Sequence, residues 1–332
     1  MRRKEKEKQN MINRTMVRTR VVQTLFAYYQ NEGQTPSVAR KALEKSFSDT
    51  YSLYIALMDL VSQINLYAEQ QLEEAASRAK ATHTVYVPNR RFVDNRFAAQ
   101  LYNNRMLRHF VEEYAIRWDN GQDAIRSVYK AITDSRLYKD YMQQPEVTYE
   151  DDRRVWRKIF SDIIPANDDM ISALEEMEVV LDHNHWATDF EVVASYVVKT
   201  IKRFHEEQAG DTPYLADQPL LPMFEKEEEL QFGQNLLQYT IDNQPGYEQL
   251  INKHLHNWEA DRVAYMDRII MLTALAEILN FPEIALEISL NEYLEIAKEY
   301  SGEKSHIFIN GILDQVLKEE KDNNLLLKQI RL

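Results

Sequence analysis

The sequence contains no cysteine, and its 332 residues include only 7 glycines and 9 prolines. Without cysteine the chain has no disulfides, thiolate nucleophiles or cysteine-based metal sites, which fits a reducing cytosol. Because glycine and proline mark turns and interrupt helices, their scarcity favours long helices over an all-β chain. No apolar run approaches the roughly 20 residues that span a bilayer, and the charged N-terminus MRRKEKEKQN does not resemble a secretory signal. We therefore expect an all-α, cytoplasmic protein.

The charge is distributed unevenly along the chain. The net charge is −13, yet the first 20 residues carry eight Lys or Arg against Glu5 and Glu7, a net of +6. A basic arm on an acidic body is expected of a protein that grips phosphate at one end. Charge alone equally allows a flexible, solubilising tail. We expect residues 1–10 to form a disordered basic arm and residues 321–332 to form a tail.

Apolar residues recur at three- and four-residue spacing through most of the chain, as in amphipathic helices. Residues 81–91 look extended, and the proline-rich stretch 209–224 is the best candidate for a linker. Helical patterns return from Glu225 to Leu317. Before the linker, the pattern predicts helices at about 11–32, 37–80 (as one helix or two), 92–118, 122–138, 148–163, 167–182 and 186–208.

Motifs for catalysis are missing from the sequence. It has no glycine-rich phosphate loop, no GxSxG and no HExxH. His183 and His185 could suggest a metal site, but residues two apart on a helix point to different faces. A surface or interhelical role suits these histidines better. We therefore expect a binding protein without catalytic residues, metal or cofactor.

Three segments, in order, resemble the NusB family of bacterial transcription antitermination factors. The first is RTMVRTRVVQTLFAYYQ at 14–30, and the second is NWEADRVAYMDRIIMLTALAEIL at 257–279. The third and most specific is ISLNEYLEIAKEYSGEKSHIFINGILDQVL at 288–317. It carries the family's Asn291-Glu292, Ala297-Lys298, Ser305-His306, Phe308, Asn310-Gly311 and Leu313-Asp314 without a gap.

The resemblance implies a bundle of two small helical subdomains. It covers roughly residues 11–65 and 225–318, so we assign the subdomains to 11–70 and 225–320. Residues 71–224 have no counterpart in a compact member of the family. We interpret them as a helical insertion with its linker at 209–224, and the resemblance leaves the insertion's role open.

The resemblance also implies a function. Family members act with NusE, a small-subunit ribosomal protein, and bind the boxA element as single-stranded RNA, chiefly in ribosomal RNA leaders. The assembly joins the elongating RNA polymerase and other Nus factors and suppresses Rho-dependent termination. The chain would therefore be an RNA-binding regulator of transcription.

A cationic helix start and a distant C-terminal turn would together form the RNA groove. Arg14 and Arg18 are i, i+4 neighbours on one helix edge, and guanidinium groups suit phosphate oxygens. An aromatic ring at Tyr300 could stack on a base, although a packed core ring remains an alternative. The candidate RNA-binding residues are Arg14, Arg18, Arg20, Gln23, Tyr300 and Lys304.

The resemblance places the partner face on the helix that contains Tyr265 and Asp267. Ribosomal proteins are basic, so an acidic docking patch would speed their association. Asp267 could instead form an intramolecular pair with Arg268. Both interpretations stay open on sequence alone.

Two other functions are compatible with parts of the sequence. NusB-like domains also occur fused to RNA methyltransferases, but those need an α/β cofactor domain and a catalytic cysteine, and this chain has no cysteine. A helical scaffold that recruits another protein without binding RNA is the second alternative. It remains open because Thr15 and Met16 dilute the family's arginine cluster and Ile307 replaces a common lysine.

Overall fold

The computed structural model describes residues 10–31, 33–207, 215–255 and 263–322, with side chains up to Glu319. This described part contains thirteen α-helices, one π-helix and one 3-10 helix, and it has no β-strand. The all-α prediction is confirmed. Most of the expected basic arm (1–10) and of the expected tail (321–332) lies outside the described residues.

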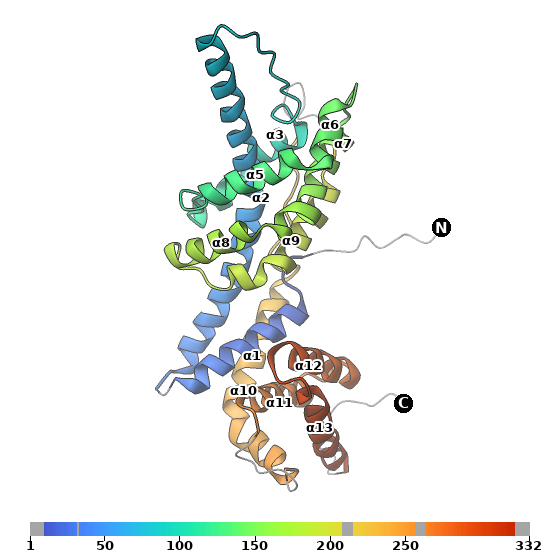
Figure 1. Ribbon diagram of the computed structural model, residues 1–332. Coiled ribbons are helices and arrows are strands. Elements are labelled where there is room, and N and C mark those ends of the chain that lie inside the picture. Colours follow the sequence, from blue (N-terminus) through green and yellow to red (C-terminus); the bar gives the residue numbers. More distant parts are fainter. Residues whose placement is uncertain (1–9, 32, 208–214, 256–262, 323–332) are drawn as a thin grey trace, which may run out of the picture. The chain divides into compact units, whose positions relative to one another are not determined.

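The chain divides into two compact units (Figure 1). Residues 1–47 and 224–332 form the first, called here the terminal unit, and residues 48–223 form the second, called the central unit. Helix α2 (Pro36–Ala81) runs without interruption through residue 48, where the central unit begins, and through residue 71, where the insertion was expected to begin. An uninterrupted helix has no turn signal from which a sequence pattern could locate such a boundary.

The terminal unit is built around helix α11 (Tyr265–Asn280). Eleven of its sixteen residues are buried, as expected for a helix that is apolar on all sides. Helices α1 (Arg14–Gln30), α10 (Glu227–Lys253), α12 (Leu286–Tyr300) and α13 (Ser305–Asp322) pack against it. Figure 1 shows α12 and α13 beside α11. The two segments of sequence that flank the central unit thus share one core.

The start of α1 is fixed by local contacts. The side chain of Asn13 accepts a hydrogen bond from the backbone N–H of Met16 and caps the helix. Further along, a Cβ on Gly233 of α10 would lie 2.8 Å from Cγ1 of Val17. The glycine therefore allows α1 and α10 to approach closely, and this contact positions the arginine-rich edge of α1.

The central unit consists of shorter helices after α2. They are α3 (Arg96–Tyr102), α4 (Arg105–Glu113), α5 (Gln122–Asp134), α6 (Arg136–Gln143), α7 (Tyr149–Lys158), the π-helix Ile159–Ile163, the 3-10 helix Ile164–Ala166, α8 (Asp168–Val180) and α9 (Trp186–Arg203). Buried Trp156 and Trp186 are the largest side chains of its core.

Several expected helices are divided in the structure. The stretch expected as one helix over 92–118 forms α3 and α4, and Asn104 caps the second of them. Likewise 122–138 is divided at Ser135, whose side chain caps α6. Asn and Ser bond to nearby backbone and so favour helix ends, which the apolar spacing alone did not reveal. The prediction over 37–80 is confirmed as a single helix. None of the described helices is long and apolar enough to cross a membrane.

Candidate nucleic-acid interface

Arg18 lies in the interior of the terminal unit, where four helices meet. Its side chain is only 3% exposed. Its Nε and one terminal nitrogen donate to the two carboxylate oxygens of Glu277 on α11, at 2.7 and 2.9 Å. A second carboxylate, that of Glu292 on α12, lies 3.5 Å away. The guanidinium also lies 5.4 Å from the ring centre of Phe232 on α10.

Glu277 is fully buried and gathers further donors. The hydroxyl groups of Ser289 and Tyr293, both on α12, donate to it at 2.6 and 2.9 Å. Burial on its own would lower the pKa of Arg18, but the hydrogen bonds and charge of Glu277 outweigh it and raise that pKa. The guanidinium is therefore a permanent cation inside a hydrogen-bonded network centred on Glu277, which joins α1 to α11 and α12.

Arg14 lies one turn before Arg18 on the same edge of α1, and its side chain is exposed. Its guanidinium lies 5.1 Å from the ring centre of Phe232, so the two arginines share one aromatic ring. A cation held over an aromatic face keeps its N–H groups available to a phosphate while its position is restricted. Arg14 is thus the member of the predicted arginine pair that faces solvent.

Arg20 and Gln23 contact each other on α1. Arg20 is buried, and one of its terminal nitrogens donates to the side-chain oxygen of Gln23 at 2.7 Å. Gln23 is half-buried. In this arrangement Gln23 orients Arg20, and the guanidinium of Arg20 is not presented to solvent.

The turn between α12 and α13 is held by a buried carboxylate. Asp267, near the start of α11, accepts hydrogen bonds from the hydroxyl groups of Ser301 and of Ser305, the latter at 2.9 Å. This anchoring leaves Lys304 exposed at the tip of the turn and Tyr300 half-buried at the end of α12. The predicted pair Tyr300 and Lys304 therefore lies on one fixed turn.

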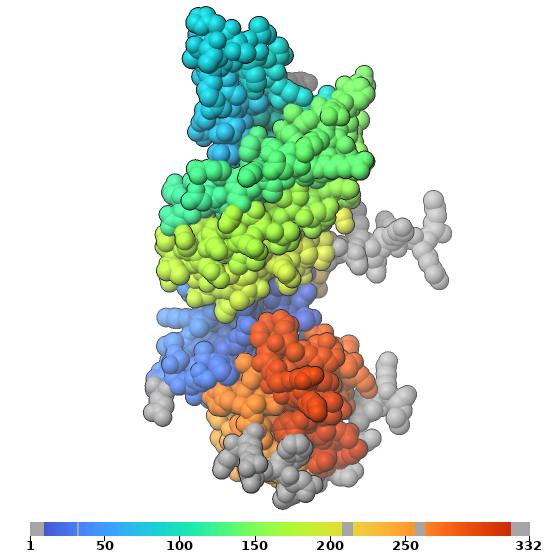
Figure 2. Space-filling view, viewed as in Figure 1, coloured from blue at the N-terminus to red at the C-terminus, as the bar shows by residue number. Residues whose placement is uncertain are grey.

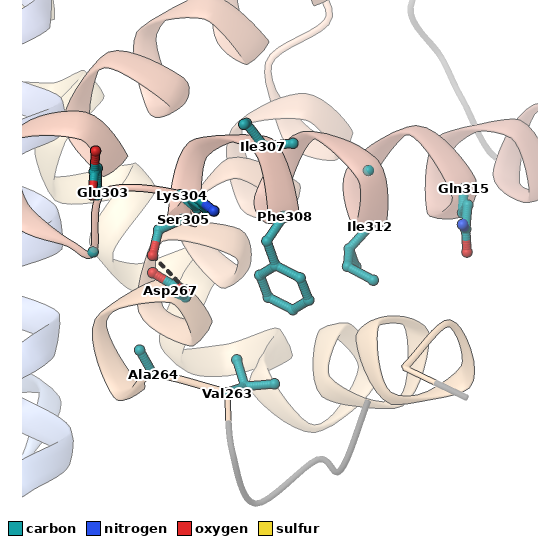
Figure 3. A pocket seen from close by; sticks show the side chains of 12 residues that line it. Val263, Ala264, Asp267, Glu303, Lys304, Ser305, Ile307, Phe308, Ile312 and Gln315 are labelled. Atoms are coloured by element: carbon teal, nitrogen blue, oxygen red, sulfur yellow. Dashed lines mark hydrogen bonds between the residues drawn. The ribbon is translucent and has the colours of Figure 1, made fainter. Parts of the chain in front are cut away.

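A pocket of about 660 Å³ opens beside this turn (Figure 3). Apolar side chains from α13 and from the residues before α11 form much of its wall, and the polar residues Asp267, Glu303, Lys304, Ser305 and Gln315 line it as well. Figure 3 shows the side chains of Phe308 and Ile312 pointing from α13 into the space above Val263. A cavity with an apolar wall can hold a flat neutral ring, and the exposed Lys304 beside it can face a phosphate.

The predicted arginine helix and the α12–α13 turn attach to different parts of α11. Arg18 contacts Glu277, whereas the turn that carries Lys304 is attached at Asp267, ten residues away on α11. At 1.5 Å per residue the two attachment points are about 15 Å apart along the helix. The structure thus does not bring Arg18 together with Tyr300, although both belong to the terminal unit.

The predicted partner residues differ in exposure. Tyr265 is 38% exposed, and its ring meets Phe26 of α1 edge-on with centroids 5.4 Å apart. Asp267 is buried, because it holds the α12–α13 turn. Arg268 lies 3.8 Å from Glu248 of α10. Tyr265 is therefore the accessible member of the predicted pair.

His183 has a structural position in the central unit. Its Nδ1 lies 2.9 Å from a carboxylate oxygen of Asp49, and its ring stacks on Trp186 at 5.0 Å. This contact joins α2 to the loop before α9, so His183 has the interhelical role that was expected from the sequence. His185 has a positive φ of 67° and begins α9. In the part of the chain that the structure describes, no group of three acidic or histidine side chains could hold a metal ion.

Sequence reasoning missed Glu277 and Phe232, which determine what the arginines do. Glu277 is the one charged residue in the apolar run IIMLTALAEIL, so it had to be buried with a partner. That signal was present in the sequence. The identity of its partner, 259 residues earlier in the chain, was not.

Comparisons with known proteins match the terminal unit and the end of the central unit. Residues 190–318 match the model of the NusB family. A protein of Salinibacter ruber is 34% identical over 137 residues, which cover 40% of this chain and 82% of that protein. One of Chloroherpeton thalassium is 40% identical over 96 residues, covering 29% of this chain and 46% of that protein. One of Clostridium botulinum is 38% identical over 94 residues, which cover 28% of this chain and 71% of that protein. All three are named transcription antitermination protein NusB, and no solved structure matches the chain.

Proposed function

Because this chain belongs to the NusB family, we propose that it is a transcription antitermination factor that binds boxA-like single-stranded RNA together with NusE. In this proposal it acts in the cytoplasm, chiefly on ribosomal RNA operons, and suppresses Rho-dependent termination. The observation that carries the proposal is family membership across the C-terminal helices, joined to an exposed arginine at the start of α1.

RNA binding would use the exposed cations of the terminal unit. Arg14 over Phe232 offers a guanidinium to one phosphate, and Lys304 offers an ammonium to another. Tyr300 and the apolar pocket beside Lys304 suit unstacked bases. The two cations lie on different elements, α1 and the α12–α13 turn, which suits a strand of several nucleotides better than a single phosphate.

Arg18, Arg20 and Gln23 support this surface from inside. Arg18 is engaged with Glu277, so a direct RNA contact would first have to break a buried ion pair. We therefore assign Arg18 the role of fixing α1, and with it Arg14, in place. Arg20 and Gln23 receive the same supporting role, since their side chains bond to each other.

NusE would dock near Tyr265, and RNA polymerase with other Nus factors would complete the assembly. Tyr265 is 38% exposed and its ring packs edge-on against Phe26, so the ring can contact a partner without losing its position. Asp267 would act indirectly, by holding the α12–α13 turn. Binding of this kind requires no catalytic group.

RNA affinity of the full-length chain tests the proposal. Fluorescence anisotropy would compare a boxA-like RNA with a scrambled RNA of equal length, with and without NusE, at one stated salt concentration. We expect preferential binding to the boxA-like strand, tightened by NusE. Equal affinity for both strands under both conditions would refute RNA recognition and favour the alternative, a helical scaffold that binds proteins only.

A further inference from the structure

The central unit contains a long stretch of single-signed charge. Between Lys158 and Lys199 the sequence has no lysine or arginine but nine acidic residues. Residues 48–223 carry 19 Lys and Arg against 29 Asp and Glu, a net of −10. The stretch thus holds nearly the whole net charge of this unit. It forms α8 and most of α9, which pack side by side and occupy a continuous band in Figure 2.

Helix α8 has one face in the core and one face in solvent. Met170, Leu174 and Met177 are buried. On the other side, Val179 is 79% exposed and Val180 is 64% exposed. Ile171, Asp168, Asp169, Glu175 and Glu176 are exposed as well. We call these seven residues the outer face of α8, and it combines apolar side chains with carboxylates.

The carboxylates of this face are not neutralised by any described cation. Asp168, Asp169, Glu175 and Glu176 are exposed and form no ion pair with any other residue that the structure describes. The first two lie in the first turn, where the helix dipole favours them. Glu175 and Glu176 lie toward the negative end of a helix that has no basic residue in its last turn. Their negative charges near the negative end of the helix dipole therefore destabilise α8 when nothing is bound to it.

Glu178 is an acidic residue of α8 that has a structural role within the protein. Its carboxylate accepts hydrogen bonds from the backbone N–H groups of Trp186 and Ala187, at 2.8 and 3.3 Å, at the start of α9. Glu175 and Glu176 have no such bonds. An acidic surface can serve solubility alone, but that purpose does not explain why Val179 and Val180 stand beside the acids.

We propose that the outer face of α8 docks a basic amphipathic helix of a partner protein. Lysine or arginine side chains of that helix would meet Glu175 and Glu176, and its apolar side chains would cover Val179 and Val180. Like charge disfavours RNA, an anionic membrane and the same face of a second copy. This surface lies in the central unit, so the inference does not depend on RNA binding by the terminal unit.

The test uses the full-length chain and two synthetic helical peptides. One has lysine and leucine on adjoining stripes, and in the other every leucine is serine. Fluorescence anisotropy would compare wild type with Glu175→Lys/Glu176→Lys and with Val179→Ser/Val180→Ser. The matched control, Glu112→Lys/Asp134→Lys, makes the same charge change at exposed positions outside α8. Circular dichroism would check that each variant is folded.

We expect wild type to bind the lysine–leucine peptide about tenfold more tightly than the lysine–serine peptide. Each α8 variant should bind the lysine–leucine peptide about tenfold more weakly, and the control should stay within about twofold of wild type. The RNA affinity of the two α8 variants and of the control should not fall below that of wild type. Equal loss in the control, equal binding of both peptides, or no binding by wild type would overturn the proposal.

Discussion

Replacing Arg18 with methionine tests the ion pair that joins α1 to α11. Methionine keeps an unbranched apolar chain over Phe232 but removes the charge and both hydrogen bonds to Glu277. Glu277, fully buried, would retain only the hydroxyl donors of Ser289 and Tyr293. Removing one partner of a buried pair costs about 3–5 kcal/mol, because the remaining charge has lost its counterion.

A matched variant separates this effect from the loss of any arginine. Arg40 pairs with Glu44 at 3.2 Å, but both side chains are about half exposed to solvent. Arg40→Met should therefore cost less than about 1 kcal/mol. The double variant Arg18→Met/Glu277→Leu removes both buried charges, so it should be more stable than Arg18→Met alone.

Hydrogen exchange measured by mass spectrometry on the full-length chain is the appropriate assay. Trp118, Trp156 and Trp186 lie in the central unit, so tryptophan fluorescence would report mainly on the wrong part of the protein. Exchange of α11 peptides should speed up by about a hundredfold or more in Arg18→Met. If Arg18→Met changes α11 exchange no more than Arg40→Met, the pair does not stabilise the terminal unit.

Three further outcomes follow from packing, hydrogen bonding and titration. Gly233→Val should destabilise the terminal unit by about 1–3 kcal/mol in denaturant unfolding, because its Cβ would meet Val17, whereas unchanged stability would contradict the close α1–α10 packing. Asp267→Ala should loosen the α12–α13 turn by removing the acceptor of Ser305, seen as faster exchange in peptides after Tyr300; unaltered exchange there would argue against the anchor. Burial raises the pKa of Tyr54 to about 12. The buried neutral phenol therefore contributes its full stability to the central unit below about pH 10, and this contribution is lost as the pH rises through 12. Ultraviolet titration of tyrosinate should show a smaller late-titrating fraction in Tyr54→Phe, and an identical curve would contradict the burial.

The sequence predicted the helices of the terminal unit because most have a regular apolar stripe and α11 is a long apolar run that ends before Pro282. It also predicted correctly that Arg14 and Arg18 share an edge of α1, since that relation is local. It did not predict that Arg18 is buried, because burial depends on Glu277 in a helix 259 residues away. Apolar spacing defines the faces of one helix and leaves its neighbours undetermined.

The α12–α13 turn illustrates the same limit for acidic residues. Asp267 was expected on a docking surface because a basic partner suits an acidic patch. In the structure its carboxylate accepts from Ser301 and Ser305, so its charge serves the turn. The role of an isolated carboxylate depends on which hydroxyl groups the fold brings to it, and serines far along the chain give no local signal.

The measurement that tests the central claim most directly is the salt dependence of RNA binding by Arg14→Ala/Lys304→Ala. In this account each residue contacts one phosphate, so losing both should reduce the slope of log affinity against log salt by about 1.4 for a single strand. The control Arg40→Ala/Lys318→Ala removes two exposed cations that pair with acids on their own helices, and it should keep the wild-type slope. An unchanged slope and affinity in Arg14→Ala/Lys304→Ala would contradict RNA binding at this surface.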